Sequence, residues 1–328
     1  MTFEGLEIAV LVPCLNEAAA IGKVVADFRA ALPTATVYVY DNNSTDDTAK
    51  VAAAAGAEVR RERRPGKGNV VRRMFQDIEA DIYVMVDGDD TYDAASAPRL
   101  VTQLVDDNLD MLVGRRVETH QAAYRMGHRL GNRVLTGLVG KLFGSQIEDM
   151  LSGYRVFSRR FAKSFPSFSR EFEIETELTV HALQMRMSVA EIETPYKERP
   201  PGSVSKLRTF RDGWRILVTI MNLMRNERPL LFFTWIGLLF TLIAVVLGIP
   251  VLVEYLDTGL VRRFPTAILC SALGIIAVVC IATGLMLDLV AHVRREQKRL
   301  AYLRYPSPRE SQRASASAPV SKAHAITQ

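Results

Sequence analysis

The N-terminal part of the chain alternates short apolar runs with segments of helical spacing. Runs typical of buried strands lie at 6–13, 37–41, 58–62 and 82–87, and segments with helical periodicity follow the first three at 17–32, 45–55 and 67–78. This alternation predicts an α/β fold with a mostly parallel, Rossmann-like sheet, whose ligands bind beyond the carboxyl ends of the strands. Asp41 and Asp87 end two of these strands, so we expect both at that edge.

The last third of the chain is strongly apolar. Residues 230–253 and 266–287 contain no charged side chain, and each run is close to the ~20 residues that span a bilayer. The length of these runs argues against two buried core helices. Arg225 and Arg228 precede the first run, and a basic cluster that begins at Arg294 follows the second. The positive-inside rule therefore predicts a transmembrane hairpin over 230–291, with both termini cytosolic at an inner (cytoplasmic) membrane. Residues 292–328 are expected to form a basic, largely disordered cytosolic tail.

Two further segments are basic and amphipathic. Residues 120–144 combine an apolar stripe with Arg125, Arg129 and other basic side chains, and residues 207–229 lead directly into the first apolar run. Both patterns indicate helices in the membrane interface. For 120–144, an ordinary surface helix that packs its stripe on the core remains the alternative.

Length and charge fit one catalytic domain, over residues 1–206, held at a membrane. A net charge of +5 and a pI near 9.1 are too modest to indicate nucleic acid binding, and the basic residues cluster beside apolar segments, which favours anionic lipid. The three cysteines lack metal-ligand spacing, which suggests a reducing compartment. The N-terminal apolar stretch is too short for a signal sequence, so the first domain is expected to be cytosolic.

The most chemically informative segment is VDGDD, residues 86–90. Gly88 lets the backbone turn, so that Asp87 and Asp89 can converge on one point after a strand. Their hard oxygens suit Mg²⁺ or Mn²⁺, and a divalent cation there would bridge a diphosphate and neutralise the departing nucleotide. An ordinary Asp-Gly turn with solvated carboxylates is the alternative.

Three other motifs follow strands. In VPCLNE, residues 12–17, Asn16 and Glu17 offer polar contacts or merely cap a helix. In DNNSTDDT, residues 41–48, Asp41 can accept hydrogen bonds from a base or ribose, although helix capping explains part of this motif. In PGKGN, residues 65–69, Lys67 lies between glycines as a candidate phosphate contact, and such a loop alone is weak evidence.

In their order along the chain, the motifs VPCLNE, DNNSTDDT, PGKGN and VDGDD resemble those of family 2 glycosyltransferases of the GT-A fold. The segments DMLSGYRVF (149–157), EFEIETEL (171–178) and YKERPPGSVSKL (196–207) are similar to the polyprenyl-phosphate branch, which includes dolichyl-phosphate mannose synthases and bacterial lipid-phosphate glucosyltransferases. The resemblance covers about residues 6–210. It implies a nucleotide-sugar donor, a polyprenyl phosphate acceptor at the lipid bilayer and a homo-oligomer, a tetramer in the family.

The resemblance also implies roles for individual residues. Asp89, Asp149 and Arg115 are the candidate catalytic residues, and Asp87 and Asp89 the candidate metal ligands. The acceptor phosphate would contact Arg115, supported by Arg125 or Arg129. The donor nucleotide and diphosphate would contact Pro13, Asn16, Glu17, Asp41, Lys67, Gly68, Asp87, Gly88, Arg199, Ser205 and Lys206.

The implied reaction is a metal-dependent, inverting transfer of a sugar to polyprenyl phosphate. A phosphate monoester has its second pKa near 6 and is already a nucleophile at neutral pH. Asp149 would then orient substrate groups rather than remove a proton, and loop capping or pairing with Arg155 is its structural alternative. Asn42 and Asn43 stand where the family usually has Asp-Gly, so the choice between UDP and GDP donors stays open.

Three other interpretations remain. A saccharide or another lipid is an alternative acceptor, although the chain lacks a Q-x-x-R-W segment and has only two apolar runs, which argues against a processive polysaccharide synthase. A sugar-nucleotide pyrophosphorylase would carry a Gly-rich basic loop after the first strand, which VPCLNEAAAIG lacks. A non-catalytic nucleotide-sugar scaffold is disfavoured by Asp87 and Asp89. The sequence does not identify the sugar.

Overall fold

The computed structural model describes residues 3, 5–118, 137, 140, 147–166, 174–197, 218, 221, 222 and 224–317. The chain forms two compact units, Met1–Gly213 together with Lys298–Gln328, and Trp214–Gln297. In the described residues the first unit contains an α/β sheet and the second contains two long apolar helices.

The sheet of the first unit is mixed and mostly parallel. Its strands are β1 Ile8–Cys14, β2 Thr36–Asp41, β3 Glu58–Arg61, β4 Ile82–Met85, β5 Met111–Glu118, β6 Arg155–Ser158 and β7 Val189–Tyr196, in the order β3-β2-β1-β4-β6-β5-β7. β1 pairs in parallel with β2 and β4, and β7 pairs in parallel with β5. β6 lies antiparallel between β4 and β5. The predicted α/β fold class is confirmed.

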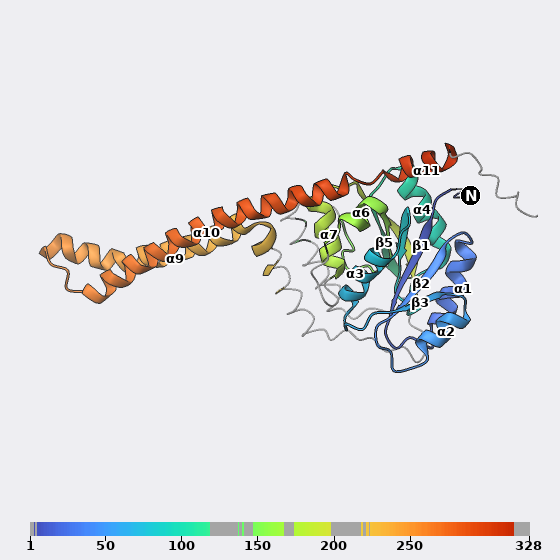
Figure 1. Ribbon diagram of the computed structural model, residues 1–328. Coiled ribbons are helices and arrows are strands. Elements are labelled where there is room, and N and C mark those ends of the chain that lie inside the picture. Colours follow the sequence, from blue (N-terminus) through green and yellow to red (C-terminus); the bar gives the residue numbers. More distant parts are fainter. Residues whose placement is uncertain are drawn as a thin grey trace, which may run out of the picture. The chain divides into compact units, whose positions relative to one another are not determined.

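Helices cover both faces of the sheet (Figure 1). α1 Ile21–Ala31, α2 Thr48–Ala54 and α4 Ala97–Asp106 lie on one face, with η1 Ala94–Ser96 before α4; α3 Lys67–Asp77, α6 Arg159–Ser164 and α7 Ile174–Gln184 lie on the other. Because side chains alternate along a strand, Val10 and Val12 of β1 enter one core while Ala9 and Leu11 enter the other. Burial on both faces explains the unbroken apolar run of this strand.

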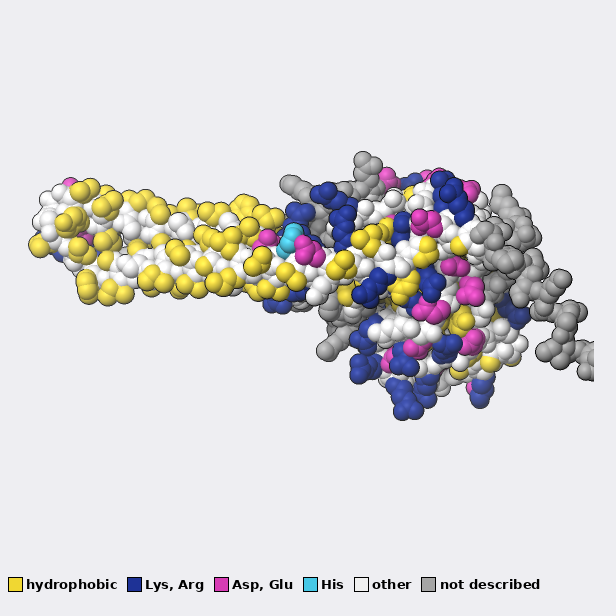
Figure 2. Space-filling model, turned by 45° about the horizontal axis from the view of Figure 1, so that its top comes forward, with side chains coloured by type: hydrophobic (Ala, Val, Ile, Leu, Met, Phe, Trp, Pro, Cys, Tyr) yellow, Lys and Arg dark blue, Asp and Glu magenta, His cyan; other side chains and the backbone are white. Residues whose placement is uncertain are grey.

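The second unit contains α9 Pro229–Thr258 and most of α10 Phe264–Tyr302. Their most apolar stretches have mean hydropathies of 2.8 and 2.5, and only 6% and 11% of those residues are buried. Figure 2 shows the surface of this hairpin covered by hydrophobic side chains. Gly259, with φ of 68°, ends α9 in the left-handed conformation common after helices. Both helices are therefore candidate membrane spans, as the sequence predicts.

The prediction of a largely disordered tail is wrong for residues 292–317. α10 continues to Tyr302, and α11 Pro308–Ser317 packs against α4. The Tyr302 hydroxyl donates to Asp110 at 3.0 Å, and its ring lies 4.8 Å from the Arg160 guanidinium. Arg159 lies over Tyr305 at 5.3 Å. These aromatic anchors attach a segment whose Ser- and Ala-rich composition resembles that of a flexible tail. Residues 318–328, the segment 120–144 except 137 and 140, and most of 207–223 lie outside the described residues.

Candidate active site

Loops that follow neighbouring parallel strands bind one another at the carboxyl edge of the sheet. Asn16 follows β1, and its side-chain oxygen accepts a hydrogen bond from the Thr45 N–H at 2.7 Å. The backbone N–H of Asn16 donates to the Ser44 hydroxyl at 2.9 Å. The N–H of Glu17 donates to the Thr48 hydroxyl at 2.9 Å. Asn16 has φ of 52°, a conformation that asparagine tolerates better than most residues. Part of the VPCLNE motif therefore has a structural role, but this role is not the helix cap that the sequence offered as an alternative, because α1 begins at Ile21 with Ala20 as its N-cap.

Asn42 attaches the loop after β2 to the glycine loop. Its amide nitrogen donates to the carbonyls of Glu62 and Arg64 at 2.9 and 2.8 Å, and its amide oxygen accepts from the Gly66 N–H at 2.7 Å. An ionised aspartate has no donor and could not make the first two bonds. Asn42 therefore joins the two loops in a way that aspartate at this position could not. The preceding residue, Asp41, is buried and accepts from the Ser44 N–H at 3.2 Å.

The DGDD loop depends on two close approaches to glycine. A Cβ at Gly88 would lie 2.5 Å from the Cys14 Sγ, so only glycine lets this loop cross the end of β1. A Cβ at Gly153 would lie 2.4 Å from the Asp87 Oδ2, so Gly153 makes room for that carboxylate. Asp89 is buried, and its Oδ1 accepts from the Thr91 hydroxyl at 2.6 Å. The predicted metal ligands thus lie in a tightly packed loop.

Lys67, the first residue of α3, lies between two carboxylates. Its Nζ is 2.5 Å from Asp87 Oδ1 and 2.5 Å from Glu175 Oε1, which belongs to the first turn of α7. Burial by itself lowers the pKa of Lys67, but attraction by Asp87 and Glu175 outweighs it and leaves the pKa above its ordinary value. The ammonium therefore stays charged and ties the predicted donor loop to the predicted metal site. Gly68, beside it, is buried in α3.

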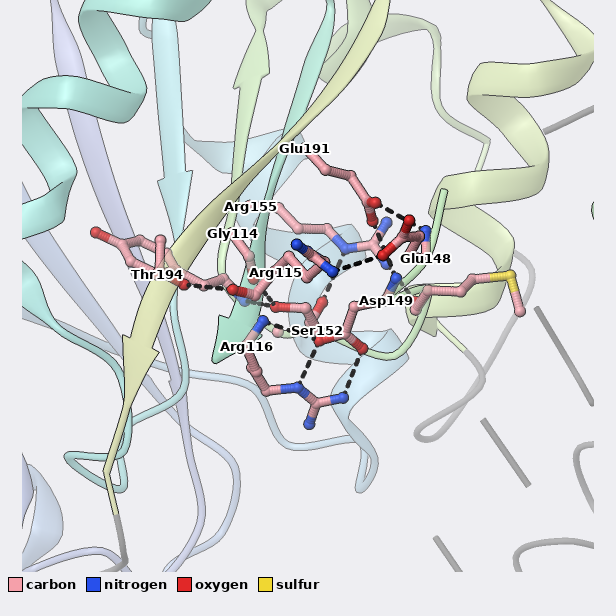
Figure 3. A network of polar contacts seen from close by, with 12 residues as sticks. Gly114, Arg115, Arg116, Glu148, Asp149, Ser152, Arg155, Glu191 and Thr194 are labelled. Carbon is pink, nitrogen blue, oxygen red and sulfur yellow. Dashed lines mark hydrogen bonds and ion pairs between the residues drawn. The ribbon is translucent and has the colours of Figure 1, made fainter. Parts of the chain in front are cut away.

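Asp149 is held by Arg116 from β5 (Figure 3). The Arg116 guanidinium donates two hydrogen bonds of 2.7 Å, one to each carboxylate oxygen, and the Arg116 N–H donates a third at 3.2 Å. The Arg116 and Asp149 side chains are only 13% and 9% exposed. Asp149 thus forms a salt bridge with Arg116, whereas the structural alternative from the sequence was pairing with Arg155.

The loop that carries Asp149 is braced from two sides. Glu191 of β7 accepts the N–H groups of Glu148 and Asp149 at 2.7 and 3.0 Å, and burial raises its pKa. Arg155 is fully buried and donates to the carbonyls of Met150 at 2.5 Å and Ser152 at 2.9 Å. Buried charges bound in this way fix a loop because any displacement leaves them without partners. Asp149 therefore occupies a preorganised position.

Arg115 points to a different partner set from its neighbour. Its guanidinium pairs with Glu148 at 2.5 Å and with Glu193, and both carboxylates are well exposed. Its own side chain is 34% exposed, so it remains accessible to an anionic ligand. Pro13 lies at the end of β1 opposite Tyr40 of β2. The other predicted residues, Arg125, Arg129, Arg199, Ser205 and Lys206, lie outside the described residues.

Sequence reasoning missed three charged residues of this site: Arg116, Glu175 and Glu191. Glu175 lies in the EFEIETEL segment, and that resemblance was the one available signal for it. Arg116 adjoins the predicted Arg115, but only the register of β5 shows which of the two faces Asp149. In the part of the chain that the structure describes, no three or more His, Cys, Asp or Glu side chains cluster as a metal site.

Comparison with known proteins shows which protein family this chain resembles. The model of the family "Glycosyl transferase family 2" matches residues 9–165. The chain is 32% identical to glycosyltransferase AglJ of Haloferax volcanii over 295 residues, which are 88% of this chain and 95% of that protein. Protein RfbJ of Shigella flexneri is 58% identical over 128 residues, 39% of this chain and 99% of its own length.

Two further similarities concern a named activity and a solved fold. The dolichyl-phosphate hexose transferase of Haloferax volcanii is 27% identical over 227 residues, 69% of this chain and 97% of that protein. The structure of Mycobacterium tuberculosis glucosyl-3-phosphoglycerate synthase, in complex with Mn²⁺, UDP and glucosyl-3-phosphoglycerate, superposes with a TM-score of 0.56. That match covers 67% of this chain and 79% of the other at 24% identity, and it shows a shared GT-A fold.

Proposed function

This glycosyltransferase belongs to family 2, and we propose that it transfers a sugar from a UDP- or GDP-sugar to a polyprenyl phosphate, with inversion and with help from Mg²⁺ or Mn²⁺. The products would be a polyprenyl-phosphate sugar and a nucleoside diphosphate. The two candidate membrane spans and the similarity to a dolichyl-phosphate hexose transferase support a lipid acceptor. We further propose an inner-membrane location, with both termini in the cytosol.

The donor would bind at the carboxyl edge of β1, β2 and β4. Asp41 and the β1 loop, with Pro13, Asn16 and Glu17, would hold the nucleoside. Asp87 and Asp89 fit a divalent cation that the protein and the donor diphosphate hold together, because Mg²⁺ is usually bound by one or two carboxylates plus phosphate oxygens. When bound, the cation would neutralise charge on the departing diphosphate.

The observation that carries the choice of acceptor is the clamp on Asp149. Its two oxygens already accept three hydrogen bonds from Arg116, which favours an orienting role over removal of a proton. A lipid phosphate needs little deprotonation at neutral pH, whereas a sugar hydroxyl needs a base. Arg115, joined by Arg125 or Arg129, would hold the acceptor phosphate as a bidentate guanidinium partner.

The proposal is tested with the full chain purified in detergent, Mn²⁺ and a panel of UDP- and GDP-sugars. Polyprenyl phosphate, the matching polyprenol and free saccharides serve as parallel acceptors, and lipid-linked product is measured by mass spectrometry. We expect product when polyprenyl phosphate is the acceptor, and none with the polyprenol or with the free saccharides. Product only with a saccharide would favour an ordinary family 2 transferase.

A pair of variants tests the role of the acidic loop. Asp89→Ala should abolish lipid-linked sugar formation. Asp90→Asn is the matched control, because Asp90 pairs with the surface residue Lys23 and its φ of 56° suits asparagine. Undiminished product from Asp89→Ala would contradict metal-dependent transfer. Complete loss in both variants would point to collapse of the loop.

A further inference from the structure

Lys67 binds Asp87, one of the two carboxylates proposed to hold a divalent cation. The Lys67 Nζ lies 2.5 Å from Asp87 Oδ1, so it stands where a cation bound to that oxygen would lie. A cation at Asp87 and an ammonium on the same oxygen would repel each other strongly at such a separation. The two positive charges therefore compete for one carboxylate oxygen.

The two carboxylates that share Lys67 differ in accessibility. The Asp87 side chain is 30% exposed, whereas Glu175 is 6% exposed and Lys67 is 10% exposed. A ligand from solvent can thus reach Asp87 more readily than Glu175. Glu175 can keep the ammonium paired after Asp87 is taken, and a buried charge without a partner would be costly.

We infer that Lys67 is a resident counter-ion that competes with the divalent cation for Asp87, and that Glu175 is the positioning residue that retains the ammonium when the cation binds. This inference rests on the proposed metal-dependent transfer. It gives the buried Glu175 of α7 a role in the donor site through its contact with Lys67. In this arrangement Lys67 suppresses cation binding before the donor diphosphate arrives with its own negative charge.

The test measures Mn²⁺ binding to the full chain in detergent without nucleotide, from the loss of the free Mn²⁺ signal in electron paramagnetic resonance. Lys67→Met removes the competitor and should tighten Mn²⁺ binding. Glu175→Gln leaves Lys67 with Asp87 alone and should weaken it. Each change should be at least about twofold in Kd, because the Lys67 pairs are largely buried and are screened less than surface pairs. Glu177→Gln, a buried neighbour on α7, is the matched control and should leave the Kd unchanged.

The double variant Lys67→Met/Glu175→Gln separates competition from structural damage. It contains no unpaired buried Glu175 charge, and it should bind Mn²⁺ as tightly as Lys67→Met, because Glu175 acts only through Lys67. Weaker binding in both single variants, or a Glu175→Gln effect that persists without Lys67, would overturn the inference. So would the absence of Mn²⁺ binding in all of these proteins.

The same preparations distinguish this inference from the proposed function. If polyprenyl-phosphate sugar forms but the Kd for Mn²⁺ is the same in all variants, the counter-ion role fails and the transfer stands. If the opposite shifts in Kd appear but no acceptor phosphate is glycosylated, the counter-ion role stands and the transfer to lipid fails. Circular dichroism of each variant verifies that the α/β unit is folded.

Discussion

Replacing Gly153 by alanine tests whether the Asp149 loop sets the position of Asp87. The added Cβ would lie 2.4 Å from Asp87 Oδ2 and 2.9 Å from its Cγ, far inside van der Waals contact. The φ of Gly153 is not in the left-handed region, so alanine fits the backbone and the clash alone is tested. Overpacking of this kind costs about 1–3 kcal/mol. Asp87 must then move, and we expect sugar transfer to fall at least tenfold, on the order of the loss caused by a small misplacement at a reacting centre.

The stability measurement uses thermal unfolding in detergent, where about 2–4 °C of melting temperature corresponds to 1 kcal/mol for a domain of this size. The decisive comparison is Gly153→Ala in an Asp87→Ala background, which removes the carboxylate that the new methyl group would strike. We expect the stability cost of Gly153→Ala to shrink to within about 0.5 kcal/mol of zero there, since the two side chains act through one contact. Gly274→Ala, whose Cβ would meet nothing within 4 Å, controls for the change of residue. An equal cost in both backgrounds would refute the clash with Asp87.

Three other predictions concern buried ionisable side chains. Asp149→Ala leaves the Arg116 guanidinium without its carboxylate and should cost about 3–5 kcal/mol as well as activity, whereas Asp149→Asn should cost less; equal melting temperatures for all three proteins would contradict the pairing. Burial, assisted by the charge of Lys298, lowers the pKa of His181 to about 3, below its unfolded value near 6.5, so its protonation favours unfolding. The wild type should therefore lose up to about 1.4 kcal/mol of stability per pH unit as the pH falls below 6.5, and His181→Phe should flatten this slope in urea unfolding at pH 5–7. Asp110→Asn disrupts a buried carboxylate that accepts from Ser158, Arg160 and Tyr302, and it should lower the unfolding free energy by about 1–3 kcal/mol; an unchanged value would show that the C-terminal anchor is dispensable.

Periodicity and strand-end motifs were sufficient to predict the α/β fold class, the strands β1 to β4 and the edge at which the acidic loop lies, but not the antiparallel β6 or the strand β7. The reason is physical: a strand buried on both faces must be apolar throughout, and its loop must be polar where it meets solvent. The two apolar helices were predicted from a different feature, the length of the uncharged runs 230–253 and 266–287. The prediction of a disordered tail was wrong because it rested on the Ser- and Ala-rich composition of this segment. Two tyrosines, Tyr302 and Tyr305, make the contacts that attach it to the α/β unit.

Long-range pairs of the site were beyond sequence reasoning. Lys67 and Glu175 are 108 positions apart, and Arg116 and Asp149 are 33 apart, so no local pattern joins them. Whether Arg115 or Arg116 binds Asp149 depends on the face of β5 from which each side chain projects. A shift of one residue in the position of the strand would exchange the two. Asn42 was visible in the sequence, but its hydrogen bonds to the backbone carbonyls of the neighbouring loop were not.

The docking of α11 and Tyr302 has a consequence for how the polypeptide is made. The α/β unit is discontinuous in the chain, because its last part, Lys298–Gln328, begins near the end of α10 and after the whole of α9. A nascent chain that has just released β7 still lacks the Tyr302 partner of Asp110, so maturation of the enzyme waits for synthesis of the hairpin. The segments on either side of the hairpin must also end in the same compartment. If α9 and α10 are inserted in a bilayer, as proposed, they must therefore cross it an even number of times, because insertion of only one helix would separate the fold from its own final helix.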